Sequence, residues 1–376
     1  MIINEGIYNQ SWDTCKLSDL GSFSRGVSKH RPRNDPKLFE GGGYPLVQTG
    51  EIKDATLYIT KHNQEYGEFG RRQSKIWDAG TLCITIAANI AETAILSYPM
   101  CFPDSVVGFR ADEEKSSEIF MYYVFDYIRH TIQNAATGSA QDNINIEYLT
   151  SLDFKVPSKE KQDAIVSILY ALDKKVLCNN RINDNLQQMA YDTFMHSFFR
   201  KESNGKLGDI IVENSKSPIQ VGDAKTANNG EIPFFTSGDA ILKWPEALVT
   251  GRNCYLNTGG NADVKFYVGD AAYSTDTWCI TASGGMSDYL YLLLLSIKPE
   301  LNQKFFQGTG LKHLQKPMLK DRPIYIPTSD ELLVFNQTVQ PWFNMVASNV
   351  KESQSLVALR DWLLPMLMNG QAVIKD

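Results

Sequence analysis

Five histidines and six cysteines are the residues of this 376-residue chain best suited to bind a metal or to act as nucleophiles. The histidines are scattered, and none repeats at the spacing that places two metal ligands on one face of a helix. The cysteines form no CxxC pair, so they predict small apolar side chains in a reducing compartment. No phosphate-binding glycine loop, HExxH motif or Asn-Pro-Pro-aromatic segment for holding a flipped base is present. The chain is therefore predicted to be non-catalytic and to hold neither a metal nor a cofactor.

Basic side chains carry the strongest nucleic-acid signal. A loop broken by Pro and Gly carries Arg25, Lys29, His30, Arg31, Arg33 and Lys37, and Arg71, Arg72 and Lys75 follow it. A weaker patch comprises Lys312, His313, Lys316 and Lys320. Such side chains can neutralise phosphates, although composition alone favours an ordinary solvated loop.

Polar residues at predicted turns form a second candidate set. Amide, hydroxyl and carboxylate groups can read base edges, although most such groups satisfy their own turns. The candidates are Gln48, Thr49, Glu51, Ser139, Gln141 and Asn143 in the first half and Ser237 and Asp239 in the second.

Composition sets broad limits on the class of protein. With 43% hydrophobic and 21% charged residues, the chain is typical of globular proteins, and its length suits more than one domain. Its longest apolar run, 289–297, is too short to cross a bilayer, and its first residues lack a secretory pattern, so we expect a cytoplasmic protein. The net charge of −6 argues against nucleic-acid binding unless one face is locally basic.

Two stretches of the chain share one apolar pattern. Val156-Pro157-Ser158 opens the first, and Ile326-Pro327-Thr328 opens the second 170 positions later. Apolar residues then recur mostly in alternating steps of four and three, which places them on one narrow stripe of a helix. The predicted seam between two long helices comprises Ile165, Leu169, Leu172, Val176, Asn179, Leu186 and Met189 in the first and Phe335, Val339, Trp342, Val346, Asn349, Leu356 and Leu359 in the second.

Asparagine interrupts both seams at the same place. Asn179 and Asn349 either fix the register of the helix pair or are tolerated near an exposed end. A helix of about 40 residues spans roughly 60 Å, more than one turn of DNA. Because proline removes a backbone donor, we expect a separate short helix before Pro341 and a kink near Pro365.

The intervening segments also repeat. Residues 44–51 resemble 232–239, and we pair 80–86 with 269–273 and 104–109 with 276–280. The sequence thus predicts a mixed α/β (α+β) chain with an internal pseudo-twofold repeat. Its predicted parts are a globular domain at 1–156, a long helix at 157–203, a second globular domain at 204–326, and a second long helix with a tail at 327–376.

This arrangement resembles the DNA-specificity subunit of type I restriction-modification systems over nearly the whole chain. The similarity lies in the duplicated Pro-helix segment and in Leu359-Arg360-Asp361-Trp362-Leu363-Leu364-Pro365 with the Met366–Gly370 ending that follows. The loops at 137–139 and 308–310, each followed by a strand and Val-Pro or Ile-Pro, also fit.

The resemblance implies that each globular domain is a target-recognition domain that enters the major groove at one half of a split DNA site. The two helices would pack antiparallel as a spacer. Two modification subunits would perform S-adenosylmethionine-dependent adenine methylation, and restriction subunits would supply ATP- and Mg²⁺-dependent translocation and cleavage. Two alternatives stay open: a recognition fragment of a fused adenine methyltransferase, and a helical adaptor that binds protein but not DNA.

Overall fold

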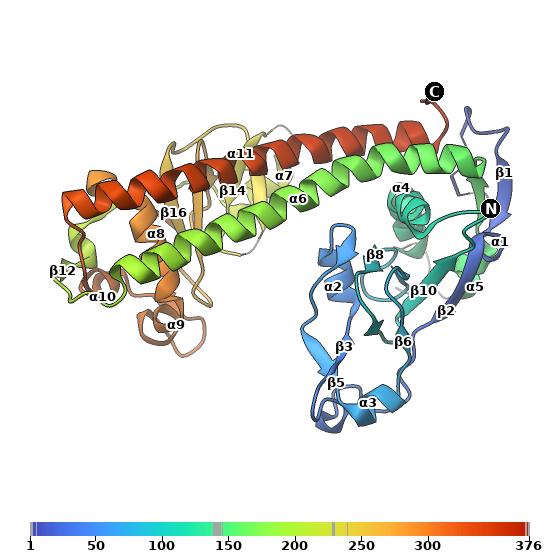
Figure 1. Ribbon diagram of the computed structural model, residues 1–376, viewed down its shortest axis with the longest axis horizontal. Coiled ribbons are helices and arrows are strands. Elements are labelled where there is room, and N and C mark those ends of the chain that lie inside the picture. The colour runs from blue at the N-terminus through green and yellow to red at the C-terminus, as the bar shows by residue number, and fades with distance from the viewer. Residues whose placement is uncertain are drawn as a thin grey trace. The chain divides into compact units, whose positions relative to one another are not determined.

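The computed structural model describes residues 3–4, 6–137, 144, 146–227, 230–238, 240–372 and 374, without side chains for 135–137 (Figure 1). The chain divides into two compact units. Unit 1 comprises Met1–Val176 and Ser355–Asp376, and unit 2 comprises Leu177–Gln354. Each unit contains one globular head and part of each long helix, α6 (Lys159–Phe198) and α11 (Ser329–Met368).

The head of unit 1 is a mixed α/β domain with two main sheets. One has the strand order β2-β10-β7-β8-β4 and the other β5-β3-β9-β6. Its strands are β1 (Asp13–Lys16), β2 (Gly21–Arg25), β3 (Tyr44–Leu46), β4 (Tyr58–Ile59), β5 (Gln64–Tyr66), β6 (Ile76–Trp77), β7 (Leu82–Thr85), β8 (Thr93–Leu96), β9 (Met100–Cys101), β10 (Val106–Ala111) and β11 (Asp153–Val156). Its helices are α1 (Leu17–Leu20), η1 (Pro36–Leu38), α2 (Thr49–Asp54), α3 (Glu68–Arg72), α4 (Glu118–Thr137) and α5 (Ile146–Ser151).

The head of unit 2 is built in the same way. Its sheets have the strand orders β13-β19-β16-β17 and β15-β14-β18. The strands are β12 (Gly205–Lys206), β13 (Ile211–Glu213), β14 (Ile232–Phe235), β15 (Ile241–Trp244), β16 (Arg252–Asn257), β17 (Val264–Val268), β18 (Ala272–Tyr273), β19 (Thr277–Ala282), β20 (Phe306–Gln307), β21 (His313–Leu314) and β22 (Pro323–Ile324). The helices are η2 (Leu207–Asp209), α7 (Val221–Thr226), η3 (Ser283–Gly285), α8 (Ser287–Ser296), α9 (Lys298–Glu300), η4 (Leu301–Phe305) and α10 (Lys316–Lys320).

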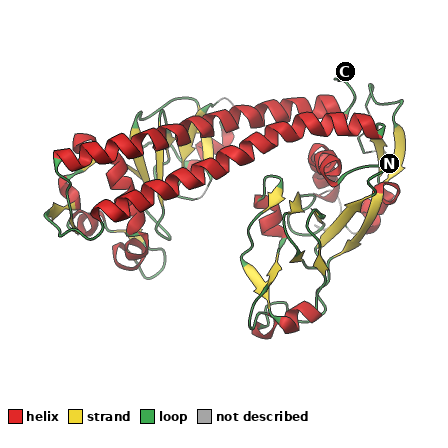
Figure 2. Ribbon diagram, viewed as in Figure 1, coloured by secondary structure: helices red, strands yellow, loops and turns green. Residues whose placement is uncertain are grey.

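The strand order of the sheets repeats between the heads, and Figure 2 shows that each head combines strands with short helices. In each head the first strand pairs antiparallel with the last strand before the long helix, β1 with β11 and β12 with β22. Even the ion pairs recur, because Lys16 Nζ lies 3.0 Å from Asp153 and Lys206 Nζ lies 3.0 Å from Asp321. By strand order β7 corresponds to β16 and β9 to β18, so our pairing of 80–86 with 269–273 is wrong. β9 has only two residues, too few to show a period, so the longer apolar strand β7 is easily mistaken for the counterpart of β18.

The two long helices run antiparallel within each unit. Asp173 of α6 contacts Arg360 of α11 in unit 1, and Phe198 of α6 packs against Phe335 of α11 in unit 2. The start of α11 has a capping box, because Thr328 and Glu331 bond to each other's backbone amides.

The expected break before Pro341 is wrong, since α11 continues through Pro341 and Pro365 as one helix of 40 residues. Proline removes one donor in each case, but apolar packing persists on both sides of it. Val339 and Phe343 are buried around Pro341, and Leu364 and Leu367 around Pro365.

The buried stripe of the helices departs from the predicted seam toward its ends. Met189 and Leu359 are exposed by 47% and 43%, so their placement in the seam is wrong. A straight α-helix drifts relative to a 3.5-residue repeat, which moves such positions off the packed face. Further buried positions are Asn183, Ala190, Phe194 and Phe343. The remaining predicted positions are buried at Ile165, Leu169, Val176, Asn179, Phe335 and Val339 and half-buried at Leu172, Leu186, Trp342, Val346, Asn349 and Leu356.

The asparagines form a polar layer between the helices of unit 2. Asn179 is fully buried, and its Nδ2 donates to Glu352 Oε2 at 2.7 Å and to Ser353 Oγ at 3.2 Å. Asn349 Nδ2 donates to Asn183 Oδ1 at 2.9 Å. Polar groups therefore face polar groups across the pair, as a register-fixing role requires.

Candidate nucleic-acid interface

The basic loop of head 1 begins at Arg25, the last residue of β2, and ends near η1. Arg31 and Arg33 both reach the carboxylate of Asp104, with Nη2–Oδ distances of 3.4 Å and 2.5 Å. Both side chains remain about half exposed. Asp104 thus orients two guanidinium groups and leaves donors of each available to solvent or to a phosphate.

His30 and Asp35 organise the turn that carries these arginines. His30 Nε2 lies 2.8 Å from Asp35 Oδ2, and Asp35 also accepts from the backbone amide of Lys37 at 3.0 Å. The hydrogen bond from His30, followed by that from Lys37, holds the pKa of the Asp35 carboxyl below its ordinary value. The two hydrogen bonds therefore favour the ionised carboxylate, which stabilises the turn.

Two adjacent cavities bring sequence-distant candidates together. A cavity of about 670 Å³ is lined by Arg33, Gln48 and Gln64, with Asn34, Pro36, Phe39 and Glu40. A second of about 240 Å³ is again lined by Arg33 and Gln48, with Thr49 and residues of neighbouring loops. Gln48 Nε2 donates to Gln64 Oε1 across the paired strands β3 and β5. Arg33, Gln48 and Thr49 therefore share one concave surface, and sequence reasoning missed Gln64 and Asn34.

Glu51 has a structural role instead. The predicted polar turn is the start of α2, where Glu51 accepts from the amide of Gln48 at 3.2 Å and from Asn63 Nδ2 at 3.0 Å. Its carboxylate is thus engaged in capping the helix, which makes Glu51 a poor base reader.

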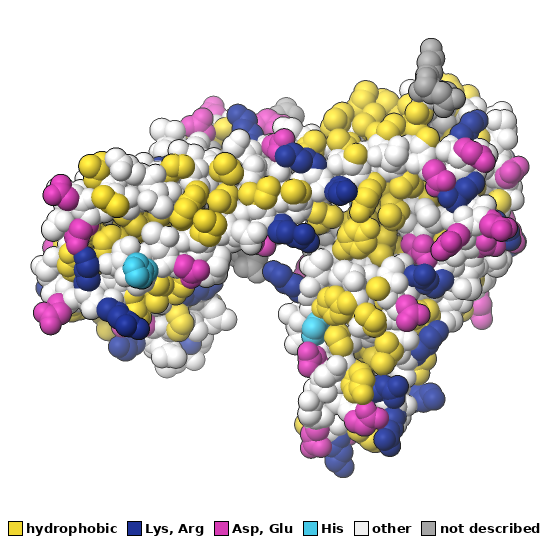
Figure 3. Space-filling view, in the orientation of Figure 1, with side chains coloured by type: hydrophobic (Ala, Val, Ile, Leu, Met, Phe, Trp, Pro, Cys, Tyr) yellow, Lys and Arg dark blue, Asp and Glu magenta, His cyan; other side chains and the backbone are white. Residues whose placement is uncertain are grey.

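Arg71, Arg72 and Lys75 lie on or beside α3 and are exposed. Arg71 stacks over the ring of Tyr44 at 5.4 Å, and Lys75 lies 3.6 Å from the ring centroid of Trp77. Arg72 Nε pairs with Glu68 at 3.2 Å. Figure 3 shows Lys and Arg side chains gathered at the end of head 1 that carries α3. At this end of head 1, Arg71 and Lys75 therefore pack against aromatic rings.

The basic patch of head 2 is largely neutralised. Glu213 lies 3.9 Å from Lys316 Nζ, accepts from Trp278 Nε1 at 2.7 Å, and bonds to Lys320. Burial beside the Trp278 ring, at 4.7 Å, lowers the pKa of Lys316, and the bond from Lys320 lowers the pKa of Glu213. Of the predicted cations here, Lys312 and His313 are exposed at the β20–β21 hairpin.

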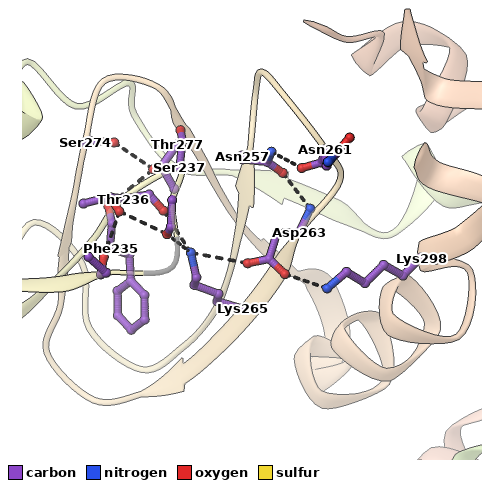
Figure 4. A network of polar contacts seen from close by, with 12 residues as sticks. Phe235, Thr236, Ser237, Asn257, Asn261, Asp263, Lys265, Ser274, Thr277 and Lys298 are labelled. Atoms are coloured by element: carbon purple, nitrogen blue, oxygen red, sulfur yellow. Dashed lines mark hydrogen bonds and ion pairs between the residues drawn. The ribbon is translucent and has the colours of Figure 1, made fainter. Parts of the chain in front are cut away.

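Hydrogen bonds from Lys265, which itself pairs with Asp263, hold the polar loop that follows β14 (Figure 4). Lys265 Nζ donates to the carbonyl oxygens of Thr236 and Gly238, and Asp263 bridges Lys265 and Lys298 at 3.4 Å and 2.7 Å. Burial raises the pKa of Asp263, but the two ammonium groups outweigh it and leave that pKa below its ordinary value. The hydroxyl of Ser237 donates to the Asp276 carbonyl, so it is already bonded. The expected contacts Ser139, Gln141, Asn143 and Asp239 lie outside the described residues.

The described residues contain no group of three His, Cys, Asp or Glu side chains arranged to hold a metal ion. Among the helices of that same part of the chain, none combines the length and apolar character needed to cross a membrane.

A family model for the type I restriction modification DNA specificity domain matches residues 9–188 and 201–339. The chain belongs to this family. Each match spans one head and extends into the long helix that follows it. DNA specificity subunits of this family are non-catalytic, and the catalytic chemistry of the restriction enzyme resides in other subunits.

Other specificity subunits are similar to this chain in sequence and in fold. The type I restriction enzyme MjaIX specificity subunit of Methanocaldococcus jannaschii is 22% identical over 417 residues, covering 98% of this chain and 95% of that protein. A putative MjaX specificity subunit from the same organism is 21% identical over 179 residues, 48% of this chain and 40% of that one. The crystal structure of the type I S subunit from M. genitalium has a TM-score of 0.60 at 14% identity and covers 98% of this chain and 99% of its own. That likeness supports the two-head, two-helix fold.

Proposed function

We propose that this subunit recognises a bipartite, gapped DNA site, with each head reading one half-site in the major groove. The observation that carries the proposal is the duplicated specificity domain, in which two heads of one strand order each precede a long helix. The antiparallel helix pair would serve as the spacer, because apolar packing and the Asn179 layer both oppose sliding of one helix past the other. The number of unread base pairs between the half-sites would follow from this spacer.

Positive charge in head 1 supports DNA contact. Arg31 and Arg33 would position phosphates, while Gln48 beside them would face a base edge. In head 2, the exposed Lys312 and His313 of the β20–β21 hairpin are the candidates for phosphate contact. Phosphate contacts supplied by partner subunits would offset the acidic balance of the chain.

The partners that we propose are two modification subunits, which bind S-adenosylmethionine and methylate adenine, and restriction subunits, which use ATP and Mg²⁺. The specificity subunit would direct both to the site and would work in the cytoplasm, where the DNA is. The long helices offer the extended docking surface that such an assembly needs.

The methylation pattern of DNA from cells that express this chain with its modification subunit tests the proposal. We expect methylated adenines in a gapped two-part motif that disappears when the chain is omitted. Unchanged methylation, with both proteins folded and associated, would contradict the proposal and favour a protein-binding adaptor. A relative in which a matching head is fused to a methyltransferase domain would instead favour a recognition fragment of a fused adenine methyltransferase.

A further inference from the structure

A buried carboxylate joins three helices in unit 1. Asp173 of α6 has a side chain that is 1% exposed, and its Oδ2 accepts from the hydroxyl of Tyr123 on α4 at 2.6 Å. Its Oδ1 accepts from Nη1 of Arg360 on α11 at 2.9 Å. The remaining guanidinium donors of Arg360 reach Asp361 at 3.0 Å and 2.7 Å. The head and both long helices therefore meet at one ion pair.

Unit 2 also has a buried ion pair where its head meets a long helix, but both charged residues belong to the head. Arg252 on β16 pairs with Asp288 on α8, whose side chain is fully buried. The same guanidinium donates to Asn344 Oδ1 and, at 3.3 Å, to the Gln340 carbonyl, and both acceptors lie on α11. In this unit the head supplies the ion pair and the helix supplies neutral acceptors.

These contacts restrict how each head sits on its part of the helix pair. Apolar packing is non-directional, so by itself it sets the angle of a head on the helices less sharply than a directional bond does. A charge-assisted hydrogen bond is directional, and a displaced head would leave a buried charge without its partner. A shift of about 1 Å is enough to break a hydrogen bond of ordinary length.

We propose that Tyr123, Asp173 and Arg360 (seat 1) and Arg252, Asp288 and Asn344 (seat 2) are positioning residues that fix each head on its part of the helix pair and so narrow the range of spacer lengths accepted between the half-sites. This inference rests on the proposed bipartite function. Each added base pair moves a half-site by about 3.4 Å and turns it by roughly 35°. A head fixed by its seat cannot follow that movement, and loss of the directional contacts would lower the free energy that following it costs.

Tyr123→Phe tests seat 1, because it removes one hydroxyl and keeps the ring and the Asp173–Arg360 ion pair. The complex of the variant with its modification subunits would be assayed on duplexes that keep both half-sites and carry the native spacer or one base pair more or fewer. We expect the ratio of methylation rates, native over altered spacer, to fall about tenfold, as for loss of a hydrogen bond to a charged group. The preferred bases within each half-site should stay the same. Asp163→Asn, in the exposed Lys159–Asp163 pair on the same helix, is the matched control and should keep the ratio.

Asn344→Ala tests seat 2 independently of any buried side chain, because Asn344 lies on the exposed surface of α11. We expect about a threefold fall in the same ratio, since Arg252 keeps Asp288 and the Gln340 carbonyl. If Tyr123→Phe does not fold, the ratio of methylation rates measured for Asn344→Ala tests the inference by itself. Wild-type spacer ratios in every folded variant would overturn the inference, whereas a wild-type complex that methylates no gapped motif would overturn the proposed function itself.

Discussion

The two heads share a strand order but present their positive charge differently. In head 1, Arg31 and Arg33 remain about half exposed beside Asp104, and Arg33 also lines a cavity. In head 2, Lys316 and Lys320 converge on Glu213, and Lys316 also lies on the Trp278 ring. The same framework thus carries one head with available charge and one whose charge is mostly used internally.

This difference teaches that DNA affinity and DNA reading need not be divided equally between the repeats. Head 1 is equipped to contribute the larger, salt-dependent share of phosphate binding. Head 2 would depend more on shape, on base contacts and on charge supplied by partner subunits. Five predictions test this difference, beginning with the helices that both units share.

The largest effects are expected in the scaffold and should be similar in both units. Leu169→Ala in unit 1 and Phe335→Ala in unit 2 each remove a buried side chain and should lower the free energy of unfolding by about 2–5 kcal/mol. The exposed counterparts Met189→Ala and Leu359→Ala should change it by less than about 0.5 kcal/mol. Urea denaturation measures all four, and a large cost at Met189 would restore the original seam assignment.

Salt dependence should separate the heads. Arg31→Ala combined with Arg33→Ala should weaken binding of the assembled complex to DNA of any sequence and reduce the slope of log K against log salt by about two. Lys316→Ala combined with Lys320→Ala should reduce it by about one, because both lysines are less exposed and Glu213 offsets one of their two charges. Titrations between about 50 and 200 mM salt measure both slopes. Equal losses would show that the two heads bind phosphate alike.

The two heads should also differ in how much one polar side chain contributes to discrimination between bases. Gln48→Ala should reduce discrimination at one position of one half-site about tenfold and leave the salt slope unchanged. Ser237→Ala should change discrimination less than about twofold, because that hydroxyl is already bonded to the Asp276 carbonyl. Methylation of a duplex library randomised in both half-sites would measure the two effects, and an unaltered motif for Gln48→Ala would remove it from the reading surface.

Releasing the lysines of head 2 should reduce the difference between the heads. Glu213→Gln removes the carboxylate that holds Lys316 and Lys320, so the salt slope should steepen by about one. Glu231→Gln makes the same change of net charge at an exposed residue that only approaches Lys243 at 3.7 Å, and it should have little effect. A steeper slope in both variants would point to net charge as the cause.

The smallest effect is a pH dependence at the start of α11. The bond from Lys201, followed by the Thr328 amide and the Tyr325 hydroxyl, lowers the pKa of Glu331 from 4.5 to about 2. Its stabilising contribution is therefore present above about pH 4.5 and is lost as the pH falls toward 2. Glu331→Gln should lower the urea midpoint at pH 7 and have progressively less effect on acidification. Glu160→Gln, at the start of α6, should show a weaker version of this trend, and a pH-independent difference at Glu331 would contradict the assignment.

Much of the fold was predictable because the long helices repeat one apolar pattern over many turns. Such a signal sums over turns, so both helices and the two-head organisation could be deduced. The continuity of α11 could not, because its packing on both sides of Pro341 overrides the local cost of proline. Strand correspondence failed at β9, where two residues are too few to show a period.

The candidate site was only partly predictable. Charge in the loop from Arg25 to Arg33 is visible in the sequence, but its pairing with Asp104 is not. Gln64 was missed because an isolated glutamine gives no signal until the register of β3 and β5 brings it opposite Leu46, beside Gln48. Glu213 was missed for a similar reason, since its effect on Lys316 depends on contacts across a separation of roughly 100 residues.

The antiparallel pairing of α6 with α11 also has a consequence for synthesis of the chain. Roughly 130 residues separate the end of α6 from the start of α11. At about 5–20 residues per second, α6 waits on the order of 10 s or more for its partner to leave the ribosome. During that time the α6 side chains that bond to α11, among them Asp173 and Asn179, lack their partners on that helix, and both heads can close before the helix pair forms. The nascent chain is therefore most prone to aggregate, and most in need of a chaperone, between the completion of head 1 and the emergence of α11.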